Sequence, residues 1–144
     1  MHYVLDPSVV MKWYVPETLT SAAVYLRDQV EEKSQLIAVP QLFFVEAANV
    51  IWKKSVLKKE FSWQEAERIY TSIMKLPFHV IEDREVLSKA MDLASVYSVS
   101  VYDAVYLACA IHLKAVFVTA DMKFAGRFMN TNLKRYVLAL ADIA

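Results

Sequence analysis

The chain has 144 residues, which fits a single domain (1–144) that buries a core without disulfides. Its sixteen basic and sixteen acidic residues cancel, so overall charge does not favour non-specific attraction to nucleic acid, and any such ligand needs locally concentrated positive charge. No signal peptide or membrane span is predicted, and the single cysteine, Cys109, excludes an intramolecular disulfide and indicates the reducing cytoplasm.

The composition also predicts contacts with other molecules. Hydrophobic residues make up 57% of the chain, above the roughly 45–50% of soluble domains. The excess favours an apolar interface with a subunit or partner. Lys53, Lys54, Lys58 and Lys59 form the one conspicuous basic cluster, which is either a solvated helix end or a nucleic-acid contact.

Short β-leaning runs alternate with stretches of helical periodicity along the chain. The predicted elements are, in chain order, strand 2–5, helix 8–14, helix 19–32, strand 36–39, helix 41–54, helix 62–75, strand 78–81, helix 83–97, helix 102–113, strand 115–119, helix 121–128 and strand 136–140. Ser62 and Glu65 have capping-box spacing, and helix 41–54 is apolar around most of its circumference, which predicts burial.

This alternation predicts an α/β fold, with a mostly parallel sheet of four to five strands flanked by helices on both faces. With one glycine, the chain has no glycine-rich phosphate loop, so Walker-type nucleotide binding and the dinucleotide fingerprint are excluded.

Two acids follow apolar strands directly. Asp6 ends the run 2–5 and Asp121 follows the run 115–119, and the carboxyl ends of strands are where open α/β sheets place ligands. Taken alone, each is equally compatible with a helix N-cap.

Two further acids lie on apolar helices. Glu46 is in the middle of helix 41–54, with Asn49 three residues later on the same predicted face, so the two are expected to point together into a cleft. The structural alternative is a buried glutamate that is satisfied by Asn49 or by a neighbouring lysine. Asp103 is near the start of helix 102–113, where compensation of the helix dipole is an alternative to ligand binding.

The four acids can converge at one end of a parallel sheet. Ligation by carboxylate oxygens suits a hard cation such as Mg²⁺ or Mn²⁺. Zinc is disfavoured because the three histidines lack ligand spacing and there is no second cysteine. Ser8 and Thr119 lie beside the acids as accessory hydroxyls, with capping as the alternative, and Cys109 lacks an activating histidine.

The chain resembles the PIN-domain family, in particular the VapC-like toxins of prokaryotic toxin–antitoxin pairs. The resemblance covers most of the chain and depends on the order of four blocks, which are Val4-Leu-Asp-Pro-Ser-Val-Val-Met-Lys-Trp, Pro40-Gln-Leu-Phe-Phe-Val-Glu-Ala-Ala-Asn, Tyr102-Asp-Ala-Val-Tyr-Leu-Ala and Thr119-Ala-Asp-Met-Lys-Phe.

By resemblance, the metal ligands are Asp6, Glu46, Asp103 and Asp121, with Ser8 and Thr119 as accessory hydroxyls. The resemblance also implies a three-layer PIN-like fold, a Mg²⁺- or Mn²⁺-dependent endoribonuclease, a homodimer and a VapB-like antitoxin partner. Metal-oriented water would attack an RNA phosphodiester, with Glu46 as ligand or base, while Lys123 and Arg127 either steady phosphate or are plain surface charge.

Other functions remain open at this point. A housekeeping RNA-processing nuclease and a non-catalytic PIN-like binding subunit are both alternatives to a toxin. A receiver module is disfavoured because no suitable aspartate and lysine pair is present. A haloacid-dehalogenase-type phosphatase is disfavoured because Ser8, and not an acid, lies two residues after Asp6.

Overall fold

The sheet at the centre of the molecule is parallel throughout, and its strands are short apolar runs. The computed structural model describes residues 2–143, and within them the strand order is β3-β2-β1-β4-β5. The register places Val4 of β1 between Ala38 of β2 and Phe117 of β4. The strands are β1 (Tyr3–Leu5), β2 (Ile37–Pro40), β3 (His79–Ile81), β4 (Val116–Thr119) and β5 (Val137–Ala139).

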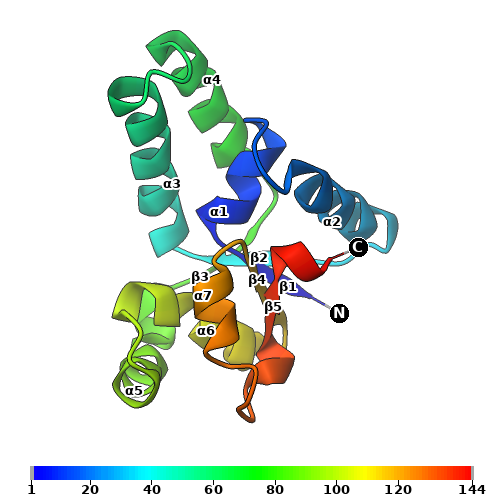
Figure 1. Ribbon diagram of the computed structural model, residues 1–144, viewed down its shortest axis with the longest axis vertical. Helices are drawn as coiled ribbons and strands as arrows, with labels where there is room; N and C mark the ends of the chain where they lie inside the picture. Colours follow the sequence, from blue (N-terminus) through cyan, green and yellow to red (C-terminus); the bar gives the residue numbers. More distant parts are fainter. Residues whose placement is uncertain (1, 144) are drawn as a thin grey trace.

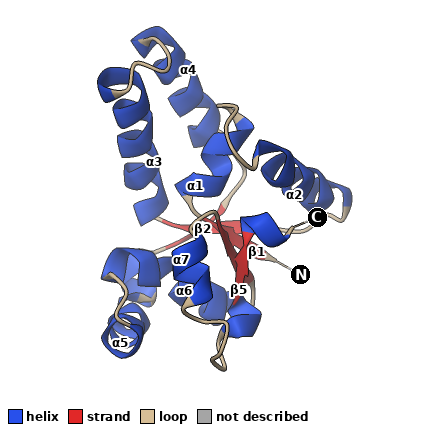
Figure 2. Ribbon diagram, in the orientation of Figure 1, coloured by secondary structure: helices blue, strands red, loops and turns tan. Residues whose placement is uncertain are grey.

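Helices cover both faces of this sheet (Figures 1 and 2), as a parallel sheet requires. The α-helices are α1 (Pro7–Val10), α2 (Thr20–Glu32), α3 (Leu42–Trp52), α4 (Trp63–Met74), α5 (Leu87–Tyr97), α6 (Val101–Leu113) and α7 (Met122–Gly126). Figure 1 shows α1 to α4 on one side of the sheet and α5 to α7 on the other. The predicted three-layer α/β architecture is therefore confirmed.

The element order follows the prediction, and the differences are at helix ends. The first predicted helix divides into α1 and a 3₁₀ turn (Met11–Trp13), and predicted helix 83–97 divides into a 3₁₀ turn (Asp83–Glu85) and α5. A π-helical segment (Lys53–Leu57) continues α3. The capping box is confirmed, because the Glu65 N–H donates to Ser62 Oγ at 3.1 Å.

Among the helices of the described residues, α6 has the most buried residues. Ser100 caps its first turn by accepting the Asp103 N–H, and every residue from Ala104 to Ala110 is buried. This helix contacts β1, β2 and β4. Because α6 packs across the middle of the sheet, the position of its first turn near the carboxyl ends of the strands is fixed.

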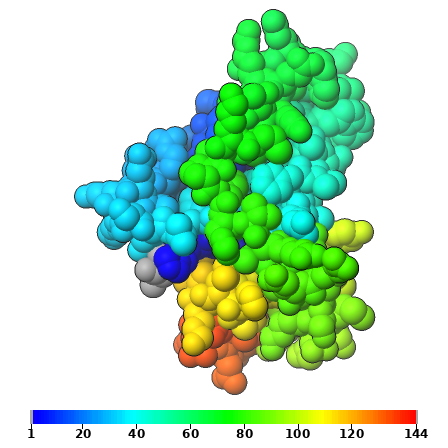
Figure 3. Space-filling model, turned by 180° about the vertical axis from the view of Figure 1, so that it is seen from behind, coloured from blue at the N-terminus to red at the C-terminus, as the bar shows by residue number. Residues whose placement is uncertain are grey.

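The pair of helices α3 and α4 projects from the sheet as an arm, and here the prediction of a buried helix was wrong. Only Phe43, Ala47 and Ile51 of α3 are buried, whereas Val45 is 70% exposed. Figure 3 shows the arm standing out above the rest of the molecule. A helix that is apolar around its circumference is buried only when neighbouring elements surround it. Helices α4 and α1 cover only part of α3.

A network of charged side chains holds this arm against the 3₁₀ turn (Met11–Trp13) and the loop that follow α1. Lys12 Nζ donates to Glu17 Oε1 at 3.0 Å, and Lys54 Nζ donates to Glu17 Oε2 at 2.9 Å and to Glu60 Oε2 at 3.4 Å. The two lysine side chains are only 10% and 12% exposed. Lys54, which the sequence places in a basic cluster, is thus a paired structural residue.

None of the helices between residues 2 and 143 is by itself long and apolar enough to cross a membrane. The consecutive helices α5 and α6 together match a span in length and composition, but they meet at a bend of 117°.

Candidate functional site

Asp6 is held at the carboxyl end of β1 by hydroxyl groups. Although it occupies the N-cap position of α1, its side chain makes no capping hydrogen bond. Instead, Oδ1 accepts from Ser8 Oγ, and Oδ2 accepts from Thr119 Oγ1 at 2.9 Å. The alternative of a plain N-cap is therefore not the observed geometry, and the sequence correctly placed both hydroxyls beside this acid.

The same two hydroxyls tie Asp6 to the start of α7. Ser8 Oγ accepts the Ala120 N–H at 3.1 Å, and Thr119 Oγ1 accepts the Asp121 N–H at 3.1 Å. Asp121 is exposed and caps α7, because its Oδ1 accepts the Phe124 N–H at 2.9 Å. One carboxylate oxygen of Asp121 is thus engaged in capping, as the alternative for this residue predicted, and its backbone N–H is linked through Thr119 Oγ1 to the carboxylate of Asp6.

Glu46 has a partner that the sequence did not predict. Its Oε1 accepts a short hydrogen bond from the hydroxyl of Tyr106, a buried side chain on α6. Asn49 is exposed and makes no hydrogen bond to Glu46, so the expected pair of Glu46 and Asn49 in one cleft is wrong. The physical reason is the arm, whose outer face carries Asn49 into solvent.

Asp103 and Tyr106 share one face of α6, because they are three residues apart. Asp103 is exposed in the first turn of the helix, where the dipole favours a negative charge. Its negative charge contributes, after burial, to the raised pKa of Glu46, so the two acids are close enough to interact electrostatically.

The acids at this end of the sheet perturb one another. Burial raises the pKa of Asp6 from 3.8 to about 6, against the hydrogen bonds from Ser8 and Thr119, and the charge of Glu46 raises it further. Burial also raises the pKa of Glu46, the Tyr106 hydrogen bond opposes this, and the charges of Asp103 and Asp83 add to it. Burial and the bond to Glu46 raise the pKa of Tyr106 far above its usual 10, so its hydroxyl stays a donor.

The donor set fits a hard divalent cation. All four candidate groups are carboxylates, and within residues 2–143 none of them is in an ion pair with a lysine, arginine or histidine. In the same described range, no three acid, histidine or cysteine groups come close enough to enclose an ion. Mg²⁺ suits such an open arrangement, since it keeps several waters and uses one or two carboxylates.

Two residues at this end were missed from the sequence. The sequence indicated Tyr106 only as a core residue. Its position three residues after Asp103 is the one signal that could have indicated a role in the site. Asp83 follows β3 as Asp6 follows β1, and its Oδ1 accepts the Leu42 N–H at the start of α3 at 3.1 Å. The strand-end pattern that identified Asp6 and Asp121 was therefore available for Asp83 too.

Thiol chemistry is not supported by the surroundings of Cys109. This side chain is buried in α6, and burial together with the charges of Asp83 and Glu85 raises its pKa to about 12. A thiol with so high a pKa is not a nucleophile near neutral pH.

Comparison with known proteins gives consistent matches. The sequence pattern of the PIN domain matches residues 3–126. Ribonuclease VapC3 of Pyrobaculum aerophilum is 30% identical over 131 residues, covering 89% of this chain and 95% of VapC3.

Two solved structures share the fold. The crystal structure of PAE2754 from Pyrobaculum aerophilum has a TM-score of 0.70 at 23% identity. The match covers 98% of this chain and 85% of the PAE2754 chain. The structure of VapBC2 from Rickettsia felis, bound to a DNA fragment from their promoter, has a TM-score of 0.65 at 14% identity and covers 96% and 98%.

Proposed function

We propose, from the premise that this chain belongs to the PIN-domain family, that it is a Mg²⁺- or Mn²⁺-dependent endoribonuclease and the toxin of a VapBC-type pair. The chain is VapC-like along most of its length. The observation that carries the metal dependence is the group of acids Asp6, Glu46, Asp103 and Asp121 at one end of the sheet, which lack basic partners within the described residues. A bound cation would compensate their negative charge.

The four acids are the residues that would hold the ion. When bound, the metal neutralises charge on the phosphate and lowers the pKa of water to yield a nucleophile. Ser8 and Thr119 restrict the Asp6 carboxylate to one orientation through their two hydrogen bonds. Asp121 is positioned through its backbone N–H, which donates to the same Thr119 hydroxyl.

Glu46 has the properties of a proton acceptor. Its raised pKa lies closer to neutral than that of an ordinary glutamate, which makes it a better base near pH 7. The Tyr106 hydroxyl occupies one of its oxygens and leaves the other free to ligate or to take a proton. Asp103 and Asp121 are exposed, so they face an incoming RNA strand together with solvent.

The proposed partners follow from the same relatives. VapBC2 of Rickettsia felis is named as a pair bound to promoter DNA, and by analogy this chain is proposed to bind a small VapB-like antitoxin. A homodimer is also proposed. Apolar side chains on the arm, including Val45, Leu57 and Trp63, are more than half exposed, and they supply the surface that such contacts need.

The test is cleavage of a structured RNA pool by purified protein with Mn²⁺ or Mg²⁺, compared with EDTA. Asp103→Asn removes a candidate ligand, and Asp92→Asn on α5 is the matched control, since it is an exposed aspartate outside the site. We expect cleavage by the wild type and the control only. Equal cleavage by Asp103→Asn, or cleavage that survives EDTA, would overturn the metal-nuclease proposal.

The assignment as a toxin needs a separate test in cells. Expression of the wild type should arrest growth, Asp103→Asn should not, and co-expression of the small protein encoded beside the gene should restore growth. Growth unaffected by an active nuclease would instead favour a housekeeping RNA-processing role.

A further inference from the structure

Basic residues outnumber acidic residues in the last quarter of this neutral chain. Between residues 104 and 141 there are five basic residues but only one acid, Asp121, which is itself a candidate metal ligand. The basic residues of this segment are Lys114, Lys123, Arg127, Lys134 and Arg135. Since RNA affinity depends on cations that neutralise phosphates, this segment is a candidate surface for RNA binding.

Three of these residues gather at the edge of the sheet opposite the carboxylates. Lys114 precedes β4, and Lys134 and Arg135 form the 3₁₀ turn (Lys134–Tyr136) that leads into β5. Because β4 and β5 are paired in parallel, the starts of both strands lie at the same edge. All three side chains are exposed, and within residues 2–143 none has a carboxylate within 4.0 Å.

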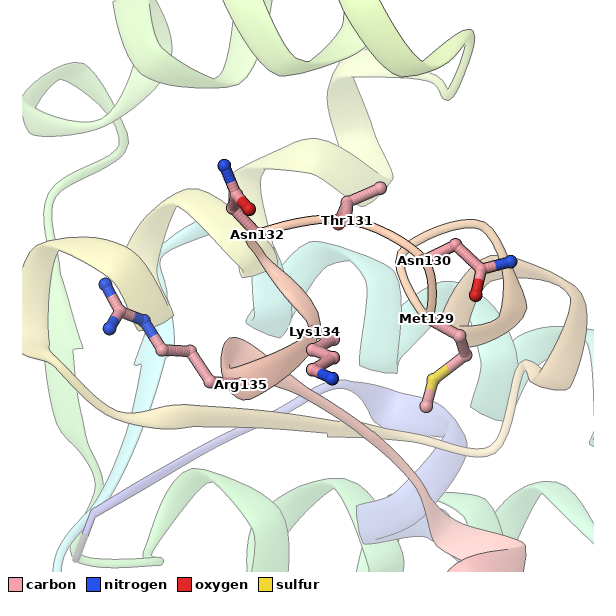
Figure 4. Close-up of a pocket in the computed structure, with 6 residues that line it drawn as sticks. All are labelled: Met129, Asn130, Thr131, Asn132, Lys134 and Arg135. Atoms are coloured by element: carbon pink, nitrogen blue, oxygen red, sulfur yellow. The ribbon is translucent and has the colours of Figure 1, made fainter.

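The surface around them is hollowed and contains no acid. A concavity of about 730 Å³ is lined by Met129, Asn130, Thr131, Asn132, Lys134 and Arg135 (Figure 4). A second, of about 450 Å³, is lined by Lys114, Ala115, Val116, Arg135 and Tyr136. Arg135 therefore borders both, and its guanidinium lies 4.9 Å from the centre of the Tyr136 ring, which supports it.

The geometry is that of a track and not of a single pocket. In Figure 4 the side chains of Lys134 and Arg135 leave the turn in different directions, so their charges cover a stretch of surface. The amides of Asn130 and Asn132 add hydrogen-bond donors along the same loop. Charges spread along a surface with intervening donors suit the repeated phosphates of a nucleic-acid backbone.

We propose that Lys114, Lys134 and Arg135 form a second RNA contact, which binds the phosphodiester backbone at the amino edge of β4 and β5, away from the cleavage site. This inference rests on the proposed function for the identity of the ligand. Helix α7 is capped by Asp121 and packs against β5, and it carries Lys123 between the two ends of the sheet. An RNA strand that follows α7 passes from the carboxylates to this basic edge.

A contact remote from the reacting phosphate binds the substrate and the transition state equally. It therefore lowers KM and leaves kcat unchanged. It also explains how a chain of zero net charge approaches a polyanion through an acidic site, because the attraction comes from the opposite edge.

The experiment compares two double charge reversals in the full chain. Lys134→Glu with Arg135→Glu removes the proposed contact. Lys33→Glu with Lys75→Glu makes the same change of charge at exposed positions that belong neither to the basic cluster 53–59 nor to the candidate site. Binding of a labelled single-stranded RNA is measured in EDTA at several salt concentrations, so that cleavage does not contribute, and thermal unfolding checks that both variants fold.

We expect the 134/135 variant to bind RNA at least about ten-fold more weakly, with a salt dependence shallower by about 1.4 in log–log slope, or about 0.7 per lost phosphate contact. The 33/75 control should change affinity less than about two-fold. Equal losses in both variants, or no loss in either, would overturn the inference and assign the surface to another partner, such as an acidic protein.

Cleavage kinetics separate this inference from the proposed function. With Mn²⁺, the 134/135 variant should show a raised KM for long RNA and an unchanged kcat. If the wild type cleaves and the variant matches it in KM, the second contact is wrong and the nuclease stands. If the wild type cleaves no RNA but binding still depends on Lys134 and Arg135, the contact stands and the nuclease proposal fails.

Discussion

The molecule contains two groups of partly buried charge that are built in opposite ways. In the network between the arm and the segment that follows α1, Glu17 lies between Lys12 and Lys54, and these lysines lower its pKa against the effect of burial. At the carboxyl end of the sheet, Asp6 and Glu46 have hydroxyl partners and other acids around them, and the pKa of each is raised. The first group stabilises the fold, whereas the second opposes it.

This difference indicates which acids are structural and which are functional. A carboxylate with cationic partners is explained by the structure that it holds together. A carboxylate whose charge is disfavoured by burial and by nearby acids, with no cationic partner, needs another reason to be present, and a bound cation is the simplest one. Three substitutions, which carry four predictions, test this distinction.

The largest expected effect is the loss of activity in Asp6→Asn. Because metal-assisted catalysis contributes several kcal/mol, removal of this charge should reduce the cleavage rate by at least about 10³-fold. The measurement is single-turnover cleavage of RNA in saturating Mn²⁺. A loss of less than ten-fold would remove Asp6 from the proposed ligand set.

The same substitution should stabilise the metal-free protein. At neutral pH the native state holds an ionised Asp6 whose pKa is raised from 3.8 to about 6, a cost on the order of 3 kcal/mol. The sign follows from proton uptake, because between these values the folded state binds the proton more tightly and stability falls as pH rises.

Urea unfolding in EDTA tests this second prediction. Asp6→Asn should be more stable than the wild type above about pH 6, and the gain should disappear toward pH 3.8. A variant that is less stable than the wild type at pH 7.5 would show that Asp6 is structural after all.

The third prediction concerns the paired network. Glu17→Gln leaves the lysines without their shared counter-ion and should destabilise the protein by on the order of 1–2 kcal/mol at pH 7, less than a fully buried pair because Glu17 is partly exposed. Since the native pKa of Glu17 is lowered, its stabilisation is present above its ordinary pKa of 4.5 and is lost as pH falls through the native value. Unfolding at pH 7 and in acid should therefore give a difference that vanishes in acid.

The smallest expected effect is that of Tyr106→Phe, which keeps the ring stacked on Phe117 and removes only the hydroxyl. Loss of a hydrogen bond to a charged group costs about 1.5 kcal/mol. We expect kcat to fall about ten-fold with KM unchanged, and the affinity for Mn²⁺, measured by calorimetry, to weaken. If only thermal stability changed, Tyr106 would be a packing residue and not a positioning residue for Glu46.

The sequence predicted the elements well where the local pattern matched the surroundings. Asp6 and Asp121 were placed correctly because a strand that ends in an acid leaves that acid at the sheet edge, whichever strands are neighbours. The prediction that α3 is buried was wrong, because the apolar residues of a helix show which surface it is able to bury and do not show which elements cover it. That the four acids are metal ligands stays a prediction.

The sequence by itself determined the alternation of strands and helices, the capping of α4, and the position of each acid along its own element. These features depend on residues that are close together in the chain. Tertiary structure alone decided that Tyr106 and not Asn49 contacts Glu46, that Thr119 joins Asp6 to Asp121, and that Lys114, Lys134 and Arg135 share one edge. Each of these contacts joins separate elements, so the order of the strands and the packing of the helices against them, which no local pattern records, had to be settled first.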